Sequence, residues 1–431
     1  MMSVPPQGTL QRDEYLRRIK SAGGESACLL LTGIRRCGKT YLLRELILAI
    51  KAEGVDDSHI IYYDFENFVF PRAKNHKALK AQLASLVNAG EKYYIFLDEV
   101  QTFPGWEKAI IPFLTNDNIS IYITSSGAEA GKISRKKNIG DKLTEIKVTP
   151  LSYSEYRRTQ TPSERSDSHG LLQKASFIYE AQSIEFERYV ARGGFPSTVF
   201  DTQLGAKTKL RDIYSAIIHH DVLEKSFIKN IELLEKIIKY IFENIGAEIT
   251  VKSITKEFRE EGYNKTLSGM SGMLKALEAA LVIQKVRKIN IITGKVQNAH
   301  SRYYAGDHAL FHAISDNSDL AYYALLENII VNELGRRGYE VYSGKIRRGF
   351  VDFAAQNSAK AVCVQTVVLD EDSDELIAEK ESALEECAEF NGKPAARFMV
   401  YLDHKAPPKA ASASENIIQI ALPDFLAGTE Y

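Results

Sequence analysis

The residues with the clearest chemical signature form the segment GIRRCGKT at positions 33–40. Its spacing fits GxxxxGK[ST], in which glycines let backbone N–H groups approach phosphate oxygens closely. We expect Lys39 to contact the β- and γ-phosphates of a nucleotide and Thr40 to offer its hydroxyl to Mg²⁺. The candidate phosphate-binding residues are Gly33, Ile34, Arg35, Arg36, Cys37, Gly38, Lys39 and Thr40.

Two adjacent acids follow an apolar run, YYIFL, at residues 93–97. We expect Asp98 to hold Mg²⁺ through water and Glu99 to orient and polarise an attacking water. Adjacent acids after a buried strand can also be the start of a solvated loop. Their combination with Lys39 and Thr40 favours a hydrolytic site, with Thr40 and Asp98 as the metal ligands.

Hydroxyl side chains end the next apolar run, ISIYITSS, at residues 119–126. Ser126 is the candidate sensor of the γ-phosphate, with Thr124 as the second choice. Hydroxyls at a strand end also cap the following turn, and the sequence leaves both roles open. The predicted catalytic set is therefore Glu99, Lys39 and Ser126.

These side chains need a scaffold that brings the ends of several strands together. Apolar runs alternate with helical patterns over the first 150 residues, at 27–32, 59–63, 93–97, 119–124 and 145–148. Runs that are apolar at nearly every position suit strands covered by helices on both faces. The sequence therefore predicts an α/β fold with a parallel sheet built from βαβ units.

The rest of the chain divides into two further regions, which gives three predicted domains. They are a nucleotide-binding domain at 1–160, a helical and winged-helix-like domain at 171–315, and an α/β domain at 316–431. A polar segment at 159–170 has the composition of a linker.

The second region contains a pattern that bears on nucleic-acid binding. Over residues 249–304 a short strand, a helix, a turn, a helix and two β runs follow in the order of a winged helix, with a basic wing near 288–295. This order makes DNA a candidate partner. Winged helices also serve as packing modules between domains, and Glu257, Glu260 and Glu261 dilute the positive charge.

Composition excludes several classes of protein. Lys and Arg total 55 against 56 for Asp and Glu, so the formal net charge of −1 rules out a wholly basic nucleic-acid coat. Four scattered cysteines and nine histidines form no CxxC, HExxH or Cys/His cluster, so we do not expect a zinc site. No signal-peptide pattern and no stretch of about 18 apolar residues is visible, so we expect a cytoplasmic protein without a membrane segment.

Several motifs can be taken together. They are GIRRCGKT at 33–40, LDEVQ at 97–101, ITSS at 123–126, PLSYSEY at 150–156, GGFP at 193–196 and the pair His220-Asp221. As a set they resemble the prokaryotic AAA-type ATPases that carry a C-terminal domain of unknown function. The resemblance implies ATP and Mg²⁺ as ligands of residues 33–40, Asp98 and Glu99, and the preference for ATP over GTP rests on it alone.

The same resemblance implies a last domain similar to the restriction-endonuclease-like fold. Active members of that fold use an acid on the first helix, an Asp on a strand and a Glu-x-Lys on the next strand. The matching positions are Glu327, Asp352 and Gln365-Thr366-Val367. Because glutamine lacks the charge and valine replaces the lysine, we predict a retained scaffold without nuclease activity.

The preferred interpretation is an ATP-hydrolysing protein that uses Mg²⁺ to drive a rearrangement of its C-terminal domains on a macromolecular partner. The alternative is a non-hydrolysing regulatory or DNA-binding scaffold that holds nucleotide as a structural ligand. The client and the oligomeric state have no sequence signal.

Overall fold

The computed structural model of the 431-residue chain describes residues 10, 12–23, 28–66, 73–128, 142–159, 175–315, 322–347, 349–402 and 416–428. Contacts divide the chain into two compact units. The first comprises Met1–Pro150, Ala216–Val222 and Ala279–Leu281, and the second comprises the remainder. Of the predicted linker, residues 160–170 lie outside the described residues.

The first unit is built on a five-stranded parallel sheet in the order β2-β3-β4-β1-β5. Its strands are β1 (Cys28–Gly33), β2 (Ile60–Asp64), β3 (Tyr93–Asp98), β4 (Ile119–Ser126) and β5 (Leu143–Lys147). The predicted α/β fold with a parallel sheet is therefore confirmed for this unit.

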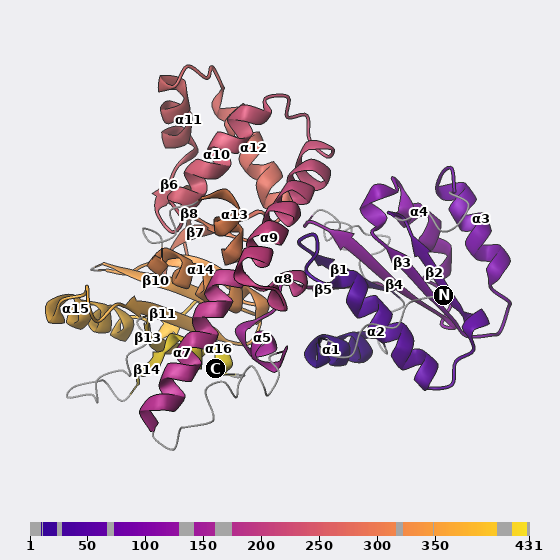
Figure 1. Cartoon of the computed structure of the whole chain (residues 1–431), viewed down its shortest axis with the longest axis horizontal. Helices are drawn as coiled ribbons and strands as arrows, with labels where there is room; N and C mark the ends of the chain where they lie inside the picture. Colours follow the sequence, from indigo (N-terminus) through magenta and orange to yellow (C-terminus); the bar gives the residue numbers. More distant parts are fainter. Residues whose placement is uncertain are drawn as a thin grey trace. The chain divides into compact units, whose positions relative to one another are not determined.

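Helices cover both faces of this sheet, with α1 and α2 on one side and α3 and α4 on the other (Figure 1). Their bounds are α1 (Asp13–Gly23), α2 (Lys39–Ala52), η1 (Asp57–His59), α3 (His76–Leu86), η2 (Val100–Thr102), α4 (Trp106–Ile110) and η3 (Ile111–Phe113). Leu79 and Trp106 join Leu30 of β1 in one buried core. Because alternate strand residues face opposite sides, burial of both faces explains the nearly continuous apolar runs.

The second unit contains most of the remaining helices. They are α5 (Tyr153–Thr159), α7 (Ala175–Arg192), α8 (Pro196–Val199), α9 (Gln203–Ile217), α10 (Ile231–Glu243), α11 (Val251–Glu260), α12 (Leu267–Ala279), η7 (His308–Leu310), α13 (Phe311–Ile314), α14 (Tyr322–Arg336), α15 (Asp374–Glu385) and α16 (Leu422–Ala427). The π-helix η6 (Ile218–Leu223) follows α9 without a break, and its residues Ile218–Val222 belong to the first unit. Among the described helices, none combines the length and the apolar character needed to cross a bilayer.

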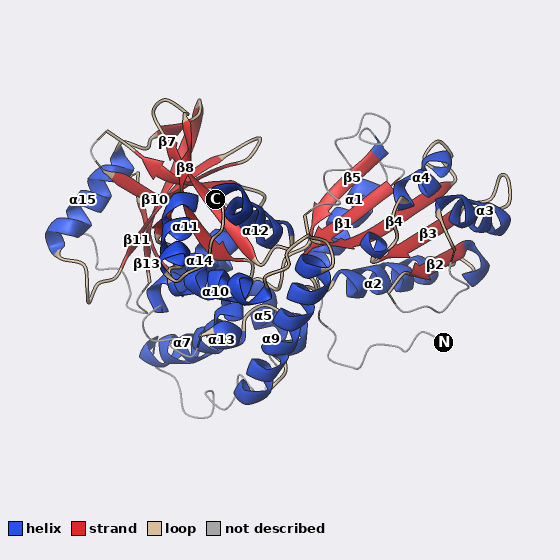
Figure 2. Ribbon diagram, turned by 90° about the horizontal axis from the view of Figure 1, so that it is seen from above, coloured by secondary structure: helices blue, strands red, loops and turns tan. Residues whose placement is uncertain are grey.

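One nine-stranded sheet runs through the second unit (Figure 2). Its strands are β6 (Glu248–Ile249), β7 (Ile283–Asn290), β8 (Val296–Ala305), β9 (Glu340–Lys345), β10 (Phe350–Gln356), β11 (Ala361–Val367), β12 (Glu389–Phe390), β13 (Lys393–Tyr401) and β14 (Ile418–Ala421). The order is β12-β13-β11-β10-β9-β7-β8-β6, with β14 beside β13.

This sheet crosses the boundary near residue 315 that the sequence predicts between its second and third domains. Strand β7 pairs with β8 on one side and, in parallel, with β9 on the other. Backbone hydrogen bonds thus join the two predicted domains, and the structure has two compact units where the sequence predicts three domains.

The segment PLSYSEY has a structural role in this fold. The backbone N–H of Ser152 donates to Oε2 of Glu155 at 2.9 Å, and the N–H of Glu155 donates to Oγ of Ser152 at 3.1 Å. This reciprocal cap starts α5. The N–H of Leu151 donates to the carbonyl of Gly194 at 2.6 Å, and the hydroxyl of Tyr189 donates to the carbonyl of Leu151 at 3.0 Å. Hydrogen bonds therefore join the PLSYSEY segment to the GGFP segment.

Candidate active site

The predicted site residues meet at one edge of the five-stranded sheet. The carboxyl ends of parallel strands lie at a common edge. In the strand register, Gly33 of β1 lies opposite Ser126 of β4, and Leu97 of β3 lies opposite Ile123 of β4. Since β4 lies between β1 and β3, the phosphate-binding loop and the acid pair approach each other across the end of β4.

The loop between β1 and α2 has a backbone that few residue types tolerate. Gly38 has a φ of 103° and Arg36 a φ of 66°. A Cβ on Gly33 would lie 2.1 Å from the carbonyl oxygen of Val148. Gly38 also caps α2 without a side-chain hydrogen bond, so the first turn of the helix presents its partial positive charge to an anion.

Arg12, which lies outside the motif, forms a hydrogen bond to the backbone of this loop. Arg12, only 1% exposed, donates from Nη1 to the carbonyl of Cys37 at 3.0 Å and from Nη2 to the carbonyl of Thr149 at 2.9 Å. The Sγ of Cys37 donates to the carbonyl of Val148 at 3.3 Å, and burial raises the pKa of this thiol. No spacing in the sequence signals Arg12, so sequence analysis missed it.

Lys39 is the centre of the site and connects the predicted catalytic residues. Its Nζ donates to Oγ of Ser126 at 2.9 Å and to the carbonyls of Gly33 and Ile34 at 3.3 and 3.1 Å. The same Nζ lies 3.7 Å from Oε1 of Glu99. Oγ of Ser126 donates in turn to Oε2 of Glu99 at 2.9 Å. The structure thus brings Lys39, Ser126 and Glu99 into one buried network.

Glu99 is held in an unusual backbone conformation by a side chain from the same motif. Its φ of 55° and ψ of 48° lie in the left-handed region, which is costly for a residue with a side chain. Nε2 of Gln101 donates to Oε2 of Glu99, while Oε1 of Gln101 accepts from the N–H of Ser126 at 3.1 Å. Strain of this kind concentrates at functional sites, and Gln101 is a supporting residue that the sequence did not assign.

The carboxylate of Asp98 accepts hydrogen bonds from three hydroxyl groups. Oδ1 accepts from Oγ1 of Thr40 at 3.2 Å and from Oγ1 of Thr124, and Oδ2 accepts from the hydroxyl of Tyr62 at 2.8 Å. Oγ1 of Thr124 also accepts from the N–H of Glu99 at 2.8 Å, so this second sensor candidate positions both acids. Hydroxyl and carboxylate oxygens are the ligands that Mg²⁺ prefers, so Thr40 and Asp98 fit the predicted metal site.

The two acids have opposite electrostatic surroundings. Burial raises the pKa of Asp98, and the neighbouring charge of Glu99 raises it further. Burial also opposes ionisation of Glu99, but the charges of Lys39 and Arg35 and the hydrogen bonds from Gln101 and Ser126 together outweigh it, so the pKa of Glu99 lies below its ordinary value. Burial disfavours the charged form of Lys39, but the nearby acidic groups, Glu99 first and then Asp221 and Asp98, together outweigh burial, so the pKa of Lys39 is raised. An ionised pair therefore lies beside a buried acid whose charged form a divalent cation would stabilise.

Arg35, a predicted phosphate-binding residue, is held by two carboxylates in this structure. Its Nε donates to Oδ2 of Asp221 at 2.7 Å, and its Nη1 donates to Oε1 of Glu66 at 2.5 Å. Both partners raise the pKa of Arg35 against the opposing effect of burial. The sequence singled out Asp221 only as part of a motif, without this contact. Arg36, the next residue, is exposed.

The residues that the resemblance assigned to a second, nuclease-like site also lie together. Oδ2 of Asp352 accepts from the N–H and the Oγ1 of Thr366, each at 2.8 Å, and Oγ1 of Thr366 lies 3.5 Å from Oε1 of Glu327. Oε1 of Gln365 accepts from the N–H of Asp352 at 2.8 Å, so its amide is used by β10. Val367 is fully buried. Burial, with the charge of Asp352, raises the pKa of Glu327 to about 7.

Two basic residues at the start of the predicted wing, Arg287 just before it and Lys288 within it, take part in ion pairs. Nη2 of Arg287 lies 2.7 Å from Oε1 of Glu340, and Nζ of Lys288 lies 2.9 Å from Oε2 of Glu248. Both cations are on β7, which is an inner strand of the sheet. The elements β6, α11, α12, β7 and β8 do follow in the predicted order, but these two charges are partly neutralised within the second unit.

Three features define a P-loop nucleotide-binding domain: a phosphate-binding loop between β1 and α2, an acid pair at the end of β3, and a parallel sheet in which β4 lies between β1 and β3. Residues 25–157 match a family model described as an AAA domain, and residues 183–321 match one described as a domain of unknown function. The chain therefore contains an AAA-type P-loop ATPase domain.

Curated relatives extend over most of the chain. An uncharacterized protein of Haemophilus influenzae is 26% identical over 357 residues, which cover 83% of this chain and 86% of that protein. An uncharacterized protein of Methanocaldococcus jannaschii is 23% identical over 313 residues, which cover 72% of this chain and 67% of that protein.

Among solved structures, a Walker-type ATPase of Pyrococcus abyssi is similar with a TM-score of 0.41 and 14% identity, over 72% of this chain and 98% of that one. A RuvB variant of Thermotoga maritima has a TM-score of 0.28 and 12% identity, over 65% and 90%.

Proposed function

We propose that this protein binds ATP with Mg²⁺ at the end of its five-stranded sheet and hydrolyses it. The observation that carries the proposal is the network of Lys39, Ser126 and Glu99 beside the pair Thr40 and Asp98. The first group supplies a cation and a carboxylate beside the place of the terminal phosphate. Thr40 and Asp98 supply oxygen ligands for a metal ion.

In the proposed reaction, a water molecule attacks the γ-phosphorus and the bond to the β–γ bridging oxygen breaks, giving ADP and phosphate. Glu99 holds and polarises this water, for which its ionised state is suited. Lys39 leaves its contacts with Glu99 and Ser126 to hold the β- and γ-phosphate oxygens. Ser126 then senses whether the γ-phosphate is present. Bound Mg²⁺, held by Thr40 and Asp98, would supply charge neutralisation on the phosphates.

Two substitutions separate binding from turnover. Glu99→Gln keeps the size and the hydrogen-bonding capacity of the side chain, so we expect retained ATP binding with phosphate release at least about 100-fold slower. Lys39→Ala removes the phosphate contact, so we expect ATP affinity to fall at least about tenfold. Lys51→Ala is the matched control, because Lys51 lies on the same helix and pairs at the surface with Asp57. Tight ATP binding by Lys39→Ala would contradict the proposal.

The rival function is a scaffold that holds nucleotide without hydrolysing it and binds DNA or another regulator. Phosphate release by the wild type that exceeds release by Glu99→Gln argues against this rival, and equal release by the two argues for it. We further propose that ATP turnover drives a rearrangement of the C-terminal part on a macromolecular client. The Glu99→Gln chain loaded with ATP is the form in which to capture that client, with duplex DNA as the first candidate tested by fluorescence anisotropy.

A further inference from the structure

The helical turn that carries Asp221 has an uncommon geometry. It belongs to η6 (Ile218–Leu223), a π-helix that follows α9 without a break. π-helical turns are rare in proteins, and those that occur are often found at functional sites. The side chain of Asp221, 1% exposed, is in a buried ion pair with Arg35. His219 and His220 of the same turn are exposed, whereas Ile218 and Val222 are buried, so the turn has a buried side and an exposed side.

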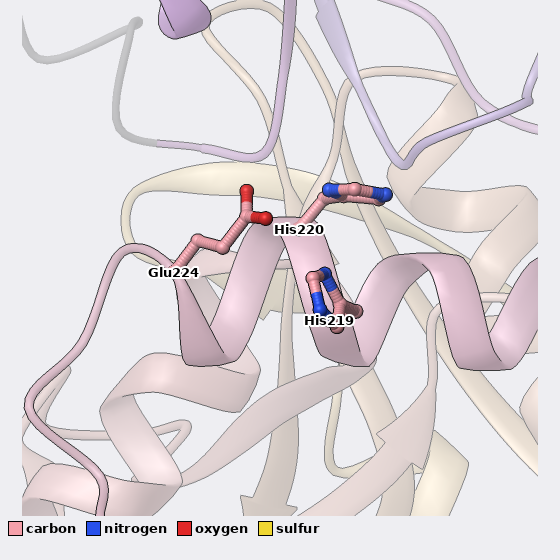
Figure 3. Close-up of side chains that lie close together, drawn as sticks. All are labelled: His219, His220 and Glu224. Atoms are coloured by element: carbon pink, nitrogen blue, oxygen red, sulfur yellow. The ribbon is translucent and has the colours of Figure 1, made fainter.

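The exposed side of the turn carries two histidines and a glutamate, which are side chains of types that can coordinate metal ions. Figure 3 shows His219, His220 and Glu224 close together, and one ligand atom of each lies within 4.8 Å of the others. The two imidazole rings have centroids 4.7 Å apart at an interplanar angle of 69°. All three side chains are exposed.

The π-helical turn explains why three ligands converge. In an α-helix, residues separated by four positions share a face, as His220 and Glu224 do. In a π-helix the hydrogen bonds join residues separated by five positions, which brings His219 close to Glu224 as well. Sequence analysis did not identify this cluster, because the familiar spacings of zinc ligands on helices and hairpins do not include it.

We propose that His219, His220 and Glu224 form a binding site for a first-row transition-metal dication such as Zn²⁺. Two imidazoles and one carboxylate are a ligand set that zinc uses with a fourth, exchangeable position open to water. Imidazole nitrogen also suits copper, nickel and iron, whereas Mg²⁺ and Ca²⁺ favour oxygen alone. The site therefore differs in ion preference from Thr40 and Asp98.

The ligand atoms of His219, His220 and Glu224 lie close enough together to coordinate one metal ion after small movements. Zinc bonds of about 2.0–2.2 Å in a tetrahedron place ligand atoms roughly 3.3 Å apart. Closing from 4.8 Å or less requires small rotations of exposed side chains. The buried ion pair of Asp221 holds the backbone of the turn, so binding orders side chains and leaves the main chain where it is.

The test uses the tag-free full-length chain, freed of metal with a chelator. We expect Zn²⁺, measured by titration calorimetry, to saturate at one equivalent, and Co²⁺ to give the visible absorption of a low-coordinate site at the same stoichiometry. His219→Ala, His220→Ala and Glu224→Gln should each weaken Zn²⁺ binding by about tenfold or more, since each removes one of three ligands.

The matched control is His59→Ala. His59 forms an exposed pair with Glu91, at 3.4 Å, and offers two ligands where the proposed site offers three. We expect wild-type Zn²⁺ affinity in this variant. Thermal unfolding of each metal-free variant checks that the fold is unchanged. Absence of saturable binding, or wild-type affinity in all three site variants, would overturn the proposal, and neither result depends on whether the chain hydrolyses ATP.

Discussion

Arg35 of the phosphate-binding loop and Asp221 of η6 form a buried ion pair between residues 186 positions apart in the chain. The side chains are 9% and 1% exposed, and Glu66 adds a second carboxylate to Arg35. Taking two charges out of water costs several kcal/mol, which their mutual attraction only partly returns. The pair therefore contributes little net stability, yet removing one partner is expensive because the other charge stays buried.

We expect Asp221→Asn to lower the free energy of unfolding of the first unit by about 2–4 kcal/mol, since it leaves Arg35 with Glu66 alone. The double variant Arg35→Met with Asp221→Leu should lose less than the single variant, because no charge remains buried. Trp106 is the single tryptophan and lies in the core of this unit, so its fluorescence in urea reports the unfolding. A single variant as stable as the wild type would show that the ion pair is not maintained in solution.

The pairing of Lys39 with Glu99 leads to a prediction about pH. Among the groups that lower the pKa of Glu99 against burial, Lys39 contributes most, and Gln101, Arg35 and Ser126 add to it. A carboxyl group whose folded pKa is lowered adds stability above its unfolded pKa, and this stability is lost as the pH falls through the folded pKa. In Lys39→Met the carboxyl group is buried without its cation, its folded pKa rises, and stability is instead lost as the pH rises.

Lys39→Met should therefore destabilise the first unit more at pH 8 than at pH 5, by about 1–3 kcal/mol. Adding Glu99→Gln to this variant should recover most of the difference, because no group then ionises in the buried site. Urea unfolding followed by Trp106 fluorescence at the two pH values measures the effect. An equal cost of Lys39→Met at both pH values would contradict the pairing.

Much of the first unit could be predicted because its signals are local. The five apolar runs correspond to β1–β5, and the spacing of Gly33, Gly38 and Lys39 places a loop directly before α2. Residues that follow consecutive parallel strands meet at one edge of the sheet, so the proximity of Lys39, Ser126 and Glu99 follows from strand ends that the sequence marks.

The missed features are contacts between distant residues. Arg12 and Asp221 reach the phosphate-binding loop from 25 and 186 positions away, and neither has a spacing that marks it. The parallel pairing of β7 with β9 depends on how the sheet closes across a predicted domain boundary. Local pattern predicts which segments are strands, but the partner of each strand is decided by tertiary packing.

The closeness of Gly33 to Val148 predicts that the loop accepts no side chain at this position. A Cβ there would lie 2.1 Å from a backbone oxygen that cannot rotate away. We expect Gly33→Ala to reduce ATP affinity at least tenfold and to lower the stability of the first unit by about 2 kcal/mol or more. Gly272→Ala is the control, because nothing lies within 4 Å of the added atom in α12, and alanine should stabilise that helix by about 0.5–1 kcal/mol. Isothermal titration with ATP and thermal unfolding test both variants, and wild-type nucleotide affinity in Gly33→Ala would refute the close approach.

The acid pair in the second unit makes its stability depend on pH in the opposite sense to Glu99. Burial and Asp352 raise the pKa of Glu327 from 4.5 to about 7. A raised folded pKa adds stability that is fully present below the unfolded pKa and is lost as the pH rises through the folded value. Between about pH 4.5 and pH 7 the second unit should therefore lose up to about 3 kcal/mol from this group. Glu327→Gln should remove that slope and be more stable than the wild type at pH 8, and thermal unfolding followed by circular dichroism between pH 5 and pH 8 measures it. Parallel pH profiles for the two proteins would mean that Glu327 is ionised throughout.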